Sequence, residues 1–349
     1  MKGKAGRLTA GCALVVCSLI ACLVLAEIGV RLFSPQPMNG SVYENTPRGY
    51  AVNKSKGTVL FSIGANKGIY HFTSPHLRGI SSSQVAEERI LVLGDSFTFG
   101  AGLPEEDTYV SRLQKKIEAT FGVGRVALLN AASGGSGTAE HLAFLEDFGG
   151  DIAPRAVVVF IGTNDFSSVE RSPLYRLRRT DTLELDEGTV PTNESIRLLH
   201  RIGVGSEIYN FLIQHLHIAQ LIRRAVIVAY FPYESRSGTP ISSDQQRLVR
   251  AIFKRMKTWC DVHGVKLAVI NNGWRMYDWL PELLASENIT FFDAASQIQP
   301  VITRDMAAYT ILGDRHPNTK GAMLVADAVW PFIQTFINEG NFDKVHSQP

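Results

Sequence analysis

Residues 89–100 read RILVLGDSFTFG, a short apolar run that ends abruptly in glycine, aspartate and serine. An uninterrupted apolar run of this length is typical of a strand that is buried on both faces of a parallel sheet. The polar string follows at the carboxyl end of that strand, where open α/β sheets collect their ligands. This arrangement predicts an α/β domain with a functional serine, Ser96, at a strand end.

The same alternation of short apolar runs and helical stretches continues along the chain. Strands are expected at residues 89–93, 126–129, 156–161, 265–270 and 290–292, and helices at 107–121, 138–148, 253–263, 276–286 and 319–338. Apolar strands that alternate with helices predict a parallel sheet covered by helices on both faces. We place this domain at residues 89–340 and interpret residues 34–88, rich in Gly, Ser, Asn and Pro, as a tether with short strands.

The interval 166–264 is far longer than an ordinary crossover between strands and is interpreted as an insertion. Within it, the alternation over residues 180–190 predicts a hairpin, and the apolar spacing over 207–229 predicts one long amphipathic helix. Two interpretations of the insertion stay open. It is either a lid over a site or a structural elaboration without contact to substrate.

Three further polar strings follow strand ends or precede the last helix. They are Asn130 to Gly137, Gly162-Thr163-Asn164 and Asp314-Arg315-His316. A serine hydroxyl is a poor nucleophile until an imidazole takes its proton, and attack on an ester carbonyl creates an oxyanion that needs aimed donors. The strings supply both kinds of group, so they predict nucleophilic catalysis by a serine.

In this order the strings resemble the SGNH/GDSL hydrolase superfamily over roughly residues 89–340. The resemblance implies a three-layer α/β/α, flavodoxin-like fold and cleavage of carboxylic esters without a cofactor. It also implies that Ser96 is the nucleophile and that its amide is one oxyanion donor. The amide of Gly135 and the side chain of Asn164 would be the other two donors, and His316 the base.

The acid that supports the histidine departs from the pattern of the superfamily. It usually stands three residues before the histidine, but Gly313 holds that place here and Asp314 stands only two before His316. We expect Asp314 to orient the imidazole, with a backbone carbonyl as the alternative. Among other histidines, His215 and His217 are two apart on a predicted helix and make a poor metal pair.

The composition and the motifs limit the classes of partner that we expect the protein to bind. The net charge of +2, from 35 basic and 33 acidic residues, lacks the concentrated basic face that a nucleic acid requires. The sequence has no Gly-x-x-x-x-Gly-Lys loop and no His-Glu-x-x-His pair, so we expect neither a nucleotide nor a metal. Cys260 is the one cysteine outside the N-terminal apolar stretch and is expected to be a buried structural thiol.

The N-terminus predicts a single membrane span over residues 1–33. Residues 8–26 carry no charge, and those 19 residues as a helix span about 28 Å against roughly 30 Å of bilayer hydrocarbon. Lys2, Lys4 and Arg7 precede the span and favour an N-in orientation. We therefore expect a protein of the bacterial cytoplasmic (inner) membrane whose main domain is periplasmic.

Two other fates of this segment stay open. A cleaved signal peptide would need a small-x-small site, for which residues 24–26 are poor. Residues 19–22 resemble a lipoprotein box ending in Cys22, but the apolar run continues beyond that cysteine. For the uncleaved anchor, we expect Glu27 and Arg31, four residues apart, to pair where the helix leaves the membrane.

Three functions are compatible with these residues. The first is a serine ester hydrolase acting on an extracytoplasmic acyl ester, for example on an acylated carbohydrate. The second is an O-acetyltransferase that passes the acyl group to a surface or exported polysaccharide. The third is a non-catalytic scaffold or carbohydrate-binding protein that keeps the fold.

Overall fold

The computed structural model describes residues 2–79, 86–162, 165–166, 169, 174–178, 182–186, 206–230, 241–274 and 277–339. The chain divides into two compact units, one of residues 1–40 and 206–234 and the other of residues 41–205 and 235–349. Helices from the predicted insertion thus belong to the same unit as the N-terminal helix.

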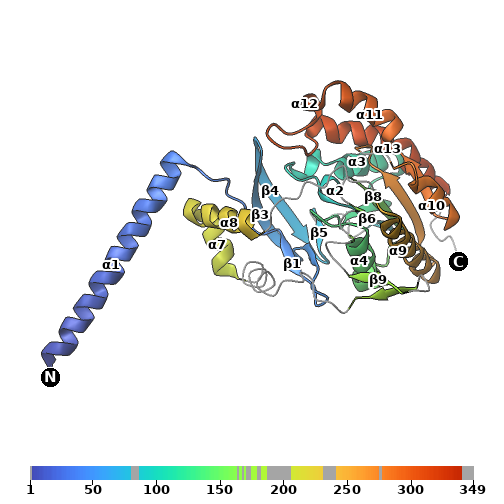
Figure 1. Cartoon of the computed structure of the whole chain (residues 1–349). Coiled ribbons are helices and arrows are strands. Elements are labelled where there is room, and N and C mark those ends of the chain that lie inside the picture. The colour runs from blue at the N-terminus through green and yellow to red at the C-terminus, as the bar shows by residue number, and fades with distance from the viewer. Residues whose placement is uncertain are drawn as a thin grey trace. The chain divides into compact units, whose positions relative to one another are not determined.

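The second unit is built on one sheet of eight strands in the order β12-β11-β8-β6-β7-β5-β4-β3 (Figure 1). Five neighbouring strands are parallel: β6 (Glu88–Leu93), β7 (Val126–Asn130), β8 (Ala156–Ile161), β11 (Lys266–Asn271) and β12 (Thr290–Asp293). All five match strands expected from the apolar runs to within one residue at each end. The α/β fold predicted from the sequence is confirmed.

The sheet is mixed, whereas the sequence predicted a parallel one. Three antiparallel strands extend it: β3 (Gly57–Ile63), β4 (Asn66–Thr73) and β5 (Leu77–Arg78), the last of which pairs with β7. A separate hairpin joins β1 (Tyr43–Asn45) to β2 (Ala51–Asn53). The strands β3 and β4 bury alternate side chains, among them Phe61 and Tyr70, in a small core with Phe99. The segment interpreted as a tether with short strands therefore supplies three strands that extend the sheet at one edge.

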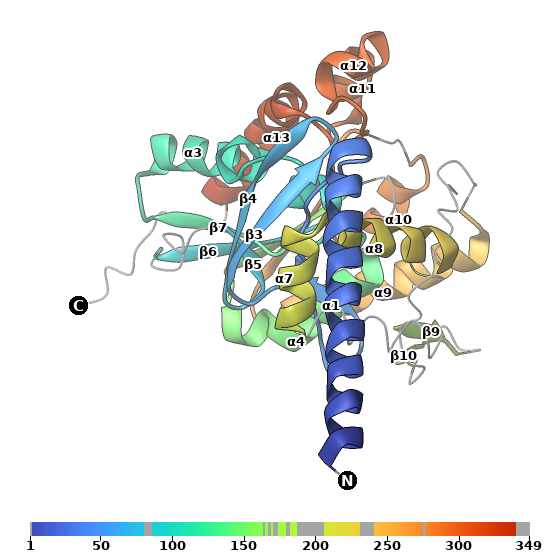
Figure 2. The same cartoon turned by 90° about the vertical axis from the view of Figure 1, so that its left-hand side faces the viewer.

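Helices cover both faces of the parallel strands (Figures 1 and 2). One face packs against α4 (Thr138–Ile152), α9 (Ser243–Val262) and α10 (Leu280–Ser286), and the other against α3 (Tyr109–Phe121), α11 (Ala295–Arg304) and α13 (Thr319–Glu339). Strand β6 shows why: Leu91 faces the first set and Ile90 the second, and both are fully buried. Each such side chain contributes about 1.5–3 kcal/mol to folding by leaving water.

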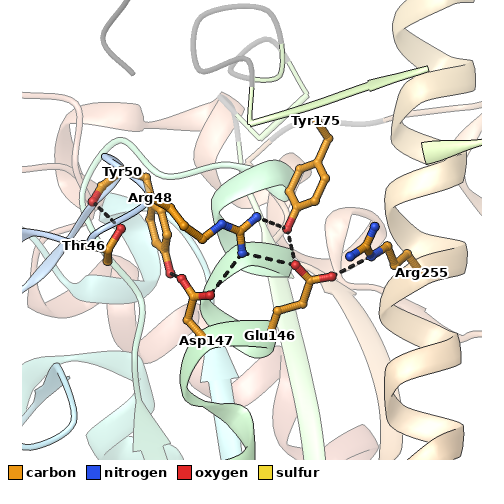
Figure 3. Close-up of polar contacts among 7 residues, drawn as sticks. All are labelled: Thr46, Arg48, Tyr50, Glu146, Asp147, Tyr175 and Arg255. Carbon is orange, nitrogen blue, oxygen red and sulfur yellow. Dashed lines mark hydrogen bonds and ion pairs between the residues drawn. The ribbon is translucent and has the colours of Figure 1, made fainter. Parts of the chain in front are cut away.

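A polar network fastens the segment before β2 to the first helical layer (Figure 3). Arg48 donates to Glu146 and Asp147 of α4, each at 3.2 Å, and to the hydroxyl of Tyr175 at 2.8 Å. Tyr175 belongs to β9 (Tyr175–Leu177), which pairs with β10 (Leu183–Leu185). Arg255 of α9 binds Glu146 from the other side at 2.6 Å. The network joins four segments that are remote in sequence.

The first unit contains α1 (Lys2–Phe33), α7 (Glu207–His215) and α8 (His217–Tyr230). Residues 11–33 of α1 contain an 18-residue window with a mean hydropathy of 2.6 and have the length needed to cross a membrane. The expected pair is present, because Arg31 Nε donates to Glu27 Oε1 at 2.6 Å.

The single helix expected over 207–229 is instead two helices that meet at Leu216, whose backbone is extended. The Glu27 carboxylate accepts the backbone amides of His217 at 2.9 Å and Ile218 at 2.8 Å, and so caps α8. Arg31 donates to the His215 carbonyl at 2.8 Å, at the end of α7. These contacts from a distant part of the chain satisfy both helix ends at the break.

Much of the hairpin expected over 180–190 lies outside the described residues, which omit 179–181 and 187–190. Within the described residues, strand β10 (183–185) pairs with the preceding strand β9. The helix expected at 107–121 begins instead at Tyr109, with Thr108 as its cap, and Asp107 lies in the short 3-10 turn Glu105–Asp107.

Candidate active site

Ser96 opens the short helix α2 (Ser96–Phe99), directly after β6. The Oδ1 atom of Asp95 accepts the Phe97 amide at 2.9 Å and caps this helix. Gly94 makes the tight corner possible, because a Cβ there would lie 2.2 Å from Thr98 Oγ1. Between residues 90 and 103, Ser96 is the one residue that is not buried. The fold thus presents this hydroxyl at the carboxyl edge of the sheet.

His316 reaches the same place from the far end of the chain. Its Nε2 atom lies 2.8 Å from Ser96 Oγ, although 220 residues separate the two. The loop that carries it is closed by the Ile311 amide, which donates to the His316 carbonyl at 2.9 Å, and by the isolated bridge between Thr310 and Pro317. Asn318 then begins the turn into α13. The loop is therefore held at both sides of the imidazole.

Asp314 lies against the other nitrogen of this imidazole. Its Oδ1 atom is 2.5 Å from His316 Nδ1 and also accepts the His316 backbone amide at 2.7 Å. A carboxylate at Nδ1 selects the tautomer with the proton on that nitrogen, which leaves Nε2 as an acceptor facing the Ser96 hydroxyl. The spacing of two residues is sufficient because the carboxylate folds back on its own loop.

The loop that carries Gly135 is bound to the end of β6. The Ser133 amide donates to the Gly94 carbonyl at 3.0 Å, and the Ser136 hydroxyl lies 2.9 Å from the same carbonyl. A Cβ on Gly134 would lie 3.8 Å from Ser96 Cβ, so this part of the loop passes beside the serine. Gly135 has a φ of 82°, the left-handed region that favours glycine. The structure therefore brings the predicted donor loop to the predicted nucleophile.

Asn164 lies outside the described residues, as does Thr163. The residues on either side of this pair, Gly162 and Asp165, are described. The Gly162 amide donates to Asp165 Oδ2 at 2.6 Å, and a Cβ on Gly162 would lie 2.6 Å from Asp95 Oδ2. The end of β8 thus packs against the carboxylate that caps the helix of Ser96.

A buried polar cluster beneath the site was not identified as functional from the sequence. It consists of Asp95, Ser136, His141 and Asp165. His141 Nε2 lies 3.2 Å from Ser136 Oγ, and its Nδ1 lies 3.5 Å from Asp165 Oδ1. The signal in the sequence is weak: Asp95 and Ser136 stand within motif strings and Asp165 directly follows one, but His141 belongs to none of them.

Burial shifts the protonation of this cluster. It lowers the pKa of His141 to about 4, which keeps the imidazole neutral. It raises the pKa of Asp95 to about 6. Burial, together with the negative charge of nearby Asp95, raises the pKa of Asp165 well above its ordinary value. With Asp165 protonated and the imidazole neutral, no charge is buried across the 3.5 Å between Nδ1 and Asp165 Oδ1, and Nε2 lies within hydrogen-bond distance of Ser136 Oγ.

The remaining candidates for reactive chemistry lie elsewhere. Cys260 is buried in α9, and burial raises the pKa of its thiol to about 12. His217 Nδ1 accepts the Gln36 amide at 2.8 Å, and His215 stacks on Phe211. Within the described ranges, no group of three or more His, Cys, Asp or Glu side chains is arranged to hold a metal.

Comparison with known proteins gives one match to a family model. The GDSL-like Lipase/Acylhydrolase family matches residues 92–324, an interval that contains Ser96 and His316. No curated protein matches the sequence at a significant level.

Several solved structures resemble the chain at low identity. The psychrotrophic esterase EstA from Pseudoalteromonas sp. is 15% identical with a TM-score of 0.42, covering 72% of this chain and 100% of that chain. TesA is 15% identical with a TM-score of 0.41, covering 71% and 99%. A catalytic mutant of Axe2, an acetylxylan esterase from Geobacillus stearothermophilus, is 13% identical with a TM-score of 0.40, covering 75% and 98%.

Proposed function

Because the chain belongs to the GDSL-like lipase/acylhydrolase family and is an ester-hydrolysing serine hydrolase, we propose that it works through an acyl-enzyme on Ser96. The single observation that carries this proposal is the chain of contacts from Ser96 Oγ through His316 to Asp314. Contacts of this kind activate a hydroxyl that is otherwise a weak nucleophile.

In the first half of the reaction, Ser96 Oγ attacks the ester carbonyl while His316 Nε2 takes its proton. The imidazolium that forms is stabilised by Asp314 at Nδ1. His316 then gives the proton to the departing alcohol oxygen as the carbon–oxygen bond of the ester breaks. The products of this half are a free alcohol and an acyl group on Ser96.

In the second half, water attacks the acyl carbonyl. His316 takes a proton from that water and returns one to Ser96 Oγ, which releases the carboxylic acid and restores the enzyme. The oxyanion formed in each half needs donors placed in advance, and the loss of one such donor typically costs about 10²- to 10³-fold in kcat. We assign this role to the amides of Ser96 and Gly135 and to the side chain of Asn164.

We also propose that α1 anchors the enzyme in the bacterial cytoplasmic membrane with the second unit on the periplasmic side. The support is the uncharged stretch over residues 8–26 and the preceding Lys2, Lys4 and Arg7. An enzyme held there meets exported polysaccharides, so esters of acylated carbohydrates are the natural substrates to test first. The intact mass of the chain isolated from membranes separates an uncleaved anchor from a processed or lipidated one.

The catalytic proposal is tested with the full chain in detergent and p-nitrophenyl acetate as the ester. Ser96→Ala is expected to lower kcat by about 10³- to 10⁶-fold, because an alanine cannot form the acyl-enzyme. Ser243→Ala, at an exposed position at the start of α9, is the matched control and keeps the parent rate. An unchanged rate in Ser96→Ala would falsify the assignment.

A second measurement identifies the covalent step. The parent should gain the mass of one fluorophosphonate adduct on Ser96, and the Ser96→Ala chain should not. Failure of the parent to react would favour the non-catalytic scaffold instead. Product analysis with a sugar acceptor present then distinguishes hydrolysis from transfer of the acyl group to a carbohydrate hydroxyl.

A further inference from the structure

The helices α7 and α8 expose apolar side chains to solvent. On α7, Ile208 is 74% exposed and Phe211 59% exposed, and the two are three residues apart, on one face of the helix. On α8, Ile222 is 59% exposed and the adjacent Leu221 is also exposed. Exposed apolar patches on a protein often mark a surface that binds a membrane or another protein.

The position of these helices in their unit indicates what covers them. Glu27 is the first charged residue after the uncharged stretch of α1, and its carboxylate binds the first two amides of α8. Arg31, one turn further along α1, binds the last turn of α7. The corner between α7 and α8 is therefore fixed to α1 at the level where that helix would leave a bilayer.

The segment after α1 strengthens this attachment. The Gln36 amide donates to His217 Nδ1 at 2.8 Å, and the side chains of Gln220 and Arg223 both donate to the Asn39 carbonyl, at 2.7 Å and 3.0 Å. Gln220 is nearly fully buried in this contact. Several contacts therefore hold the two helices to α1 and to the segment that follows it.

We propose that α7 and α8 lie on the surface of the same bilayer that α1 crosses, with their apolar faces inserted at the boundary between headgroups and acyl chains. This inference rests on the proposed anchor. Amphipathic helices with an apolar face and basic side chains bind membranes in this way.

Charge favours a lipid surface over a protein partner. On these helices Arg223 and Arg224 outnumber the one described acidic residue, Glu207. Arg224 is exposed and stands three residues after Leu221, at the spacing of neighbours on a helix surface. A long arginine beside an apolar face can bury its stem and hold its charge among anionic headgroups.

The test uses the full chain with Cys12, Cys17 and Cys22 replaced by Ala, reconstituted in vesicles of phosphatidylcholine and phosphatidylglycerol. A cysteine introduced as Phe211→Cys or Ile222→Cys is labelled with the fluorophore NBD, while buried Cys260 stays unlabelled. Val123→Cys, 84% exposed in the second unit, is the matched control. Turnover of p-nitrophenyl acetate reports that each labelled chain is folded.

Vesicles with brominated acyl chains should lower NBD emission at positions 211 and 222 by about twofold or more, because both labels lie within reach of the acyl chains. The label at position 123 should keep its emission. If the chain resists alkaline carbonate extraction but the labels at 211 and 222 are not quenched, the anchor stands and the surface contact is refuted. Blue-shifted NBD emission without quenching would show that the labels are covered by protein and not by lipid. This outcome also refutes the contact of α7 and α8 with the bilayer.

Two further outcomes complete the test. Quenching at position 123 without quenching at 211 and 222 overturns the assignment of these two helices as the contact surface. Extraction of the chain by carbonate overturns the anchor, and the surface contact with it, while leaving esterase activity untouched. Failure of the membrane inference is in this way separate from failure of the catalytic proposal.

Discussion

The Asp314 carboxylate binds His316 twice, at the ring nitrogen Nδ1 and at the backbone amide, through the same oxygen atom. The second contact explains how an acid two residues before the histidine can serve the imidazole. The backbone amide fixes the carboxylate, and the carboxylate fixes the ring, so one short loop orients the base without a separate element.

Asp314→Asn should keep this loop and lose most of the activity. The asparagine oxygen can still accept the backbone amide, but it carries no charge to stabilise the imidazolium. We expect kcat for p-nitrophenyl acetate to fall by about 10²- to 10⁴-fold with a small change in KM. Asp244→Asn, an exposed position on α9, is the matched control. A kcat in Asp314→Asn equal to that of the control would show that the carboxylate has no role in the reaction.

The parallel part of the sheet could be predicted because its strands are apolar runs with little polar interruption. Two features could not be predicted. The strands β3 to β5 follow an alternating pattern, which indicates a half-buried strand but not the sheet it joins. The break at Leu216 depends on Glu27, which lies 190 residues from His217 and is invisible in the local pattern.

In the candidate active site, too, some residues could be predicted from the sequence and others could not. Ser96 and His316 were identified because each stands in a polar string beside an apolar strand or the last helix, and the structure brings the two together. His141 was not assigned a role, because nothing in its own neighbourhood shows that it is buried against Ser136 and Asp165. Burial turns ordinary polar residues into a cluster, and only the three-dimensional packing reveals it.

Gly94 should tolerate no side chain, because the turn into α2 leaves no space. A Cβ there would lie 2.2 Å from Thr98 Oγ1 and 2.6 Å from Thr98 Cβ. Gly94→Ala is expected to cost about 1–3 kcal/mol in unfolding free energy and to lower kcat, since Ser96 moves with the turn. In α4, Gly150 has open space around its Cβ position, so Gly150→Ala should gain about 0.5–1 kcal/mol. Urea unfolding followed by tryptophan fluorescence measures both, and similar effects of the two variants would contradict the structure.

Ser136 should act as a positioning residue for the loop of Gly135. Its hydroxyl lies against the Gly94 carbonyl at 2.9 Å and against His141 Nε2 at 3.2 Å. Ser136→Ala should lower kcat by about tenfold and cost about 1–3 kcal/mol, because the buried His141 Nε2 loses its hydrogen-bond partner Ser136 Oγ.

A double variant separates position from stability. Ser136→Ala with His141→Leu replaces both partners by apolar groups and should recover much of the lost stability. It should not recover kcat, because the loop still lacks the Ser136 contact to the Gly94 carbonyl and is held there by the Ser133 amide alone. Recovery of both quantities would mean that Ser136 has a purely structural role.

The buried imidazole of His141 should make the fold sensitive to acid. Its pKa is lowered from 6.5 to about 4 by burial, so between these values the unfolded chain binds a proton that the folded chain does not. Unfolding free energy therefore falls as the pH drops through this window, by about 3 kcal/mol in total at about 1.4 kcal/mol per pKa unit. Asp95 acts in the opposite direction, because its pKa is raised to about 6 and the folded chain holds the extra proton at low pH. The measurement therefore compares the parent with His141→Gln in urea unfolding at pH 7 and pH 4.5. Both chains contain Asp95, so its contribution cancels in the comparison. His141→Gln should lose less stability on acidification than the parent, and equal losses in the two chains would show that His141 is not held neutral.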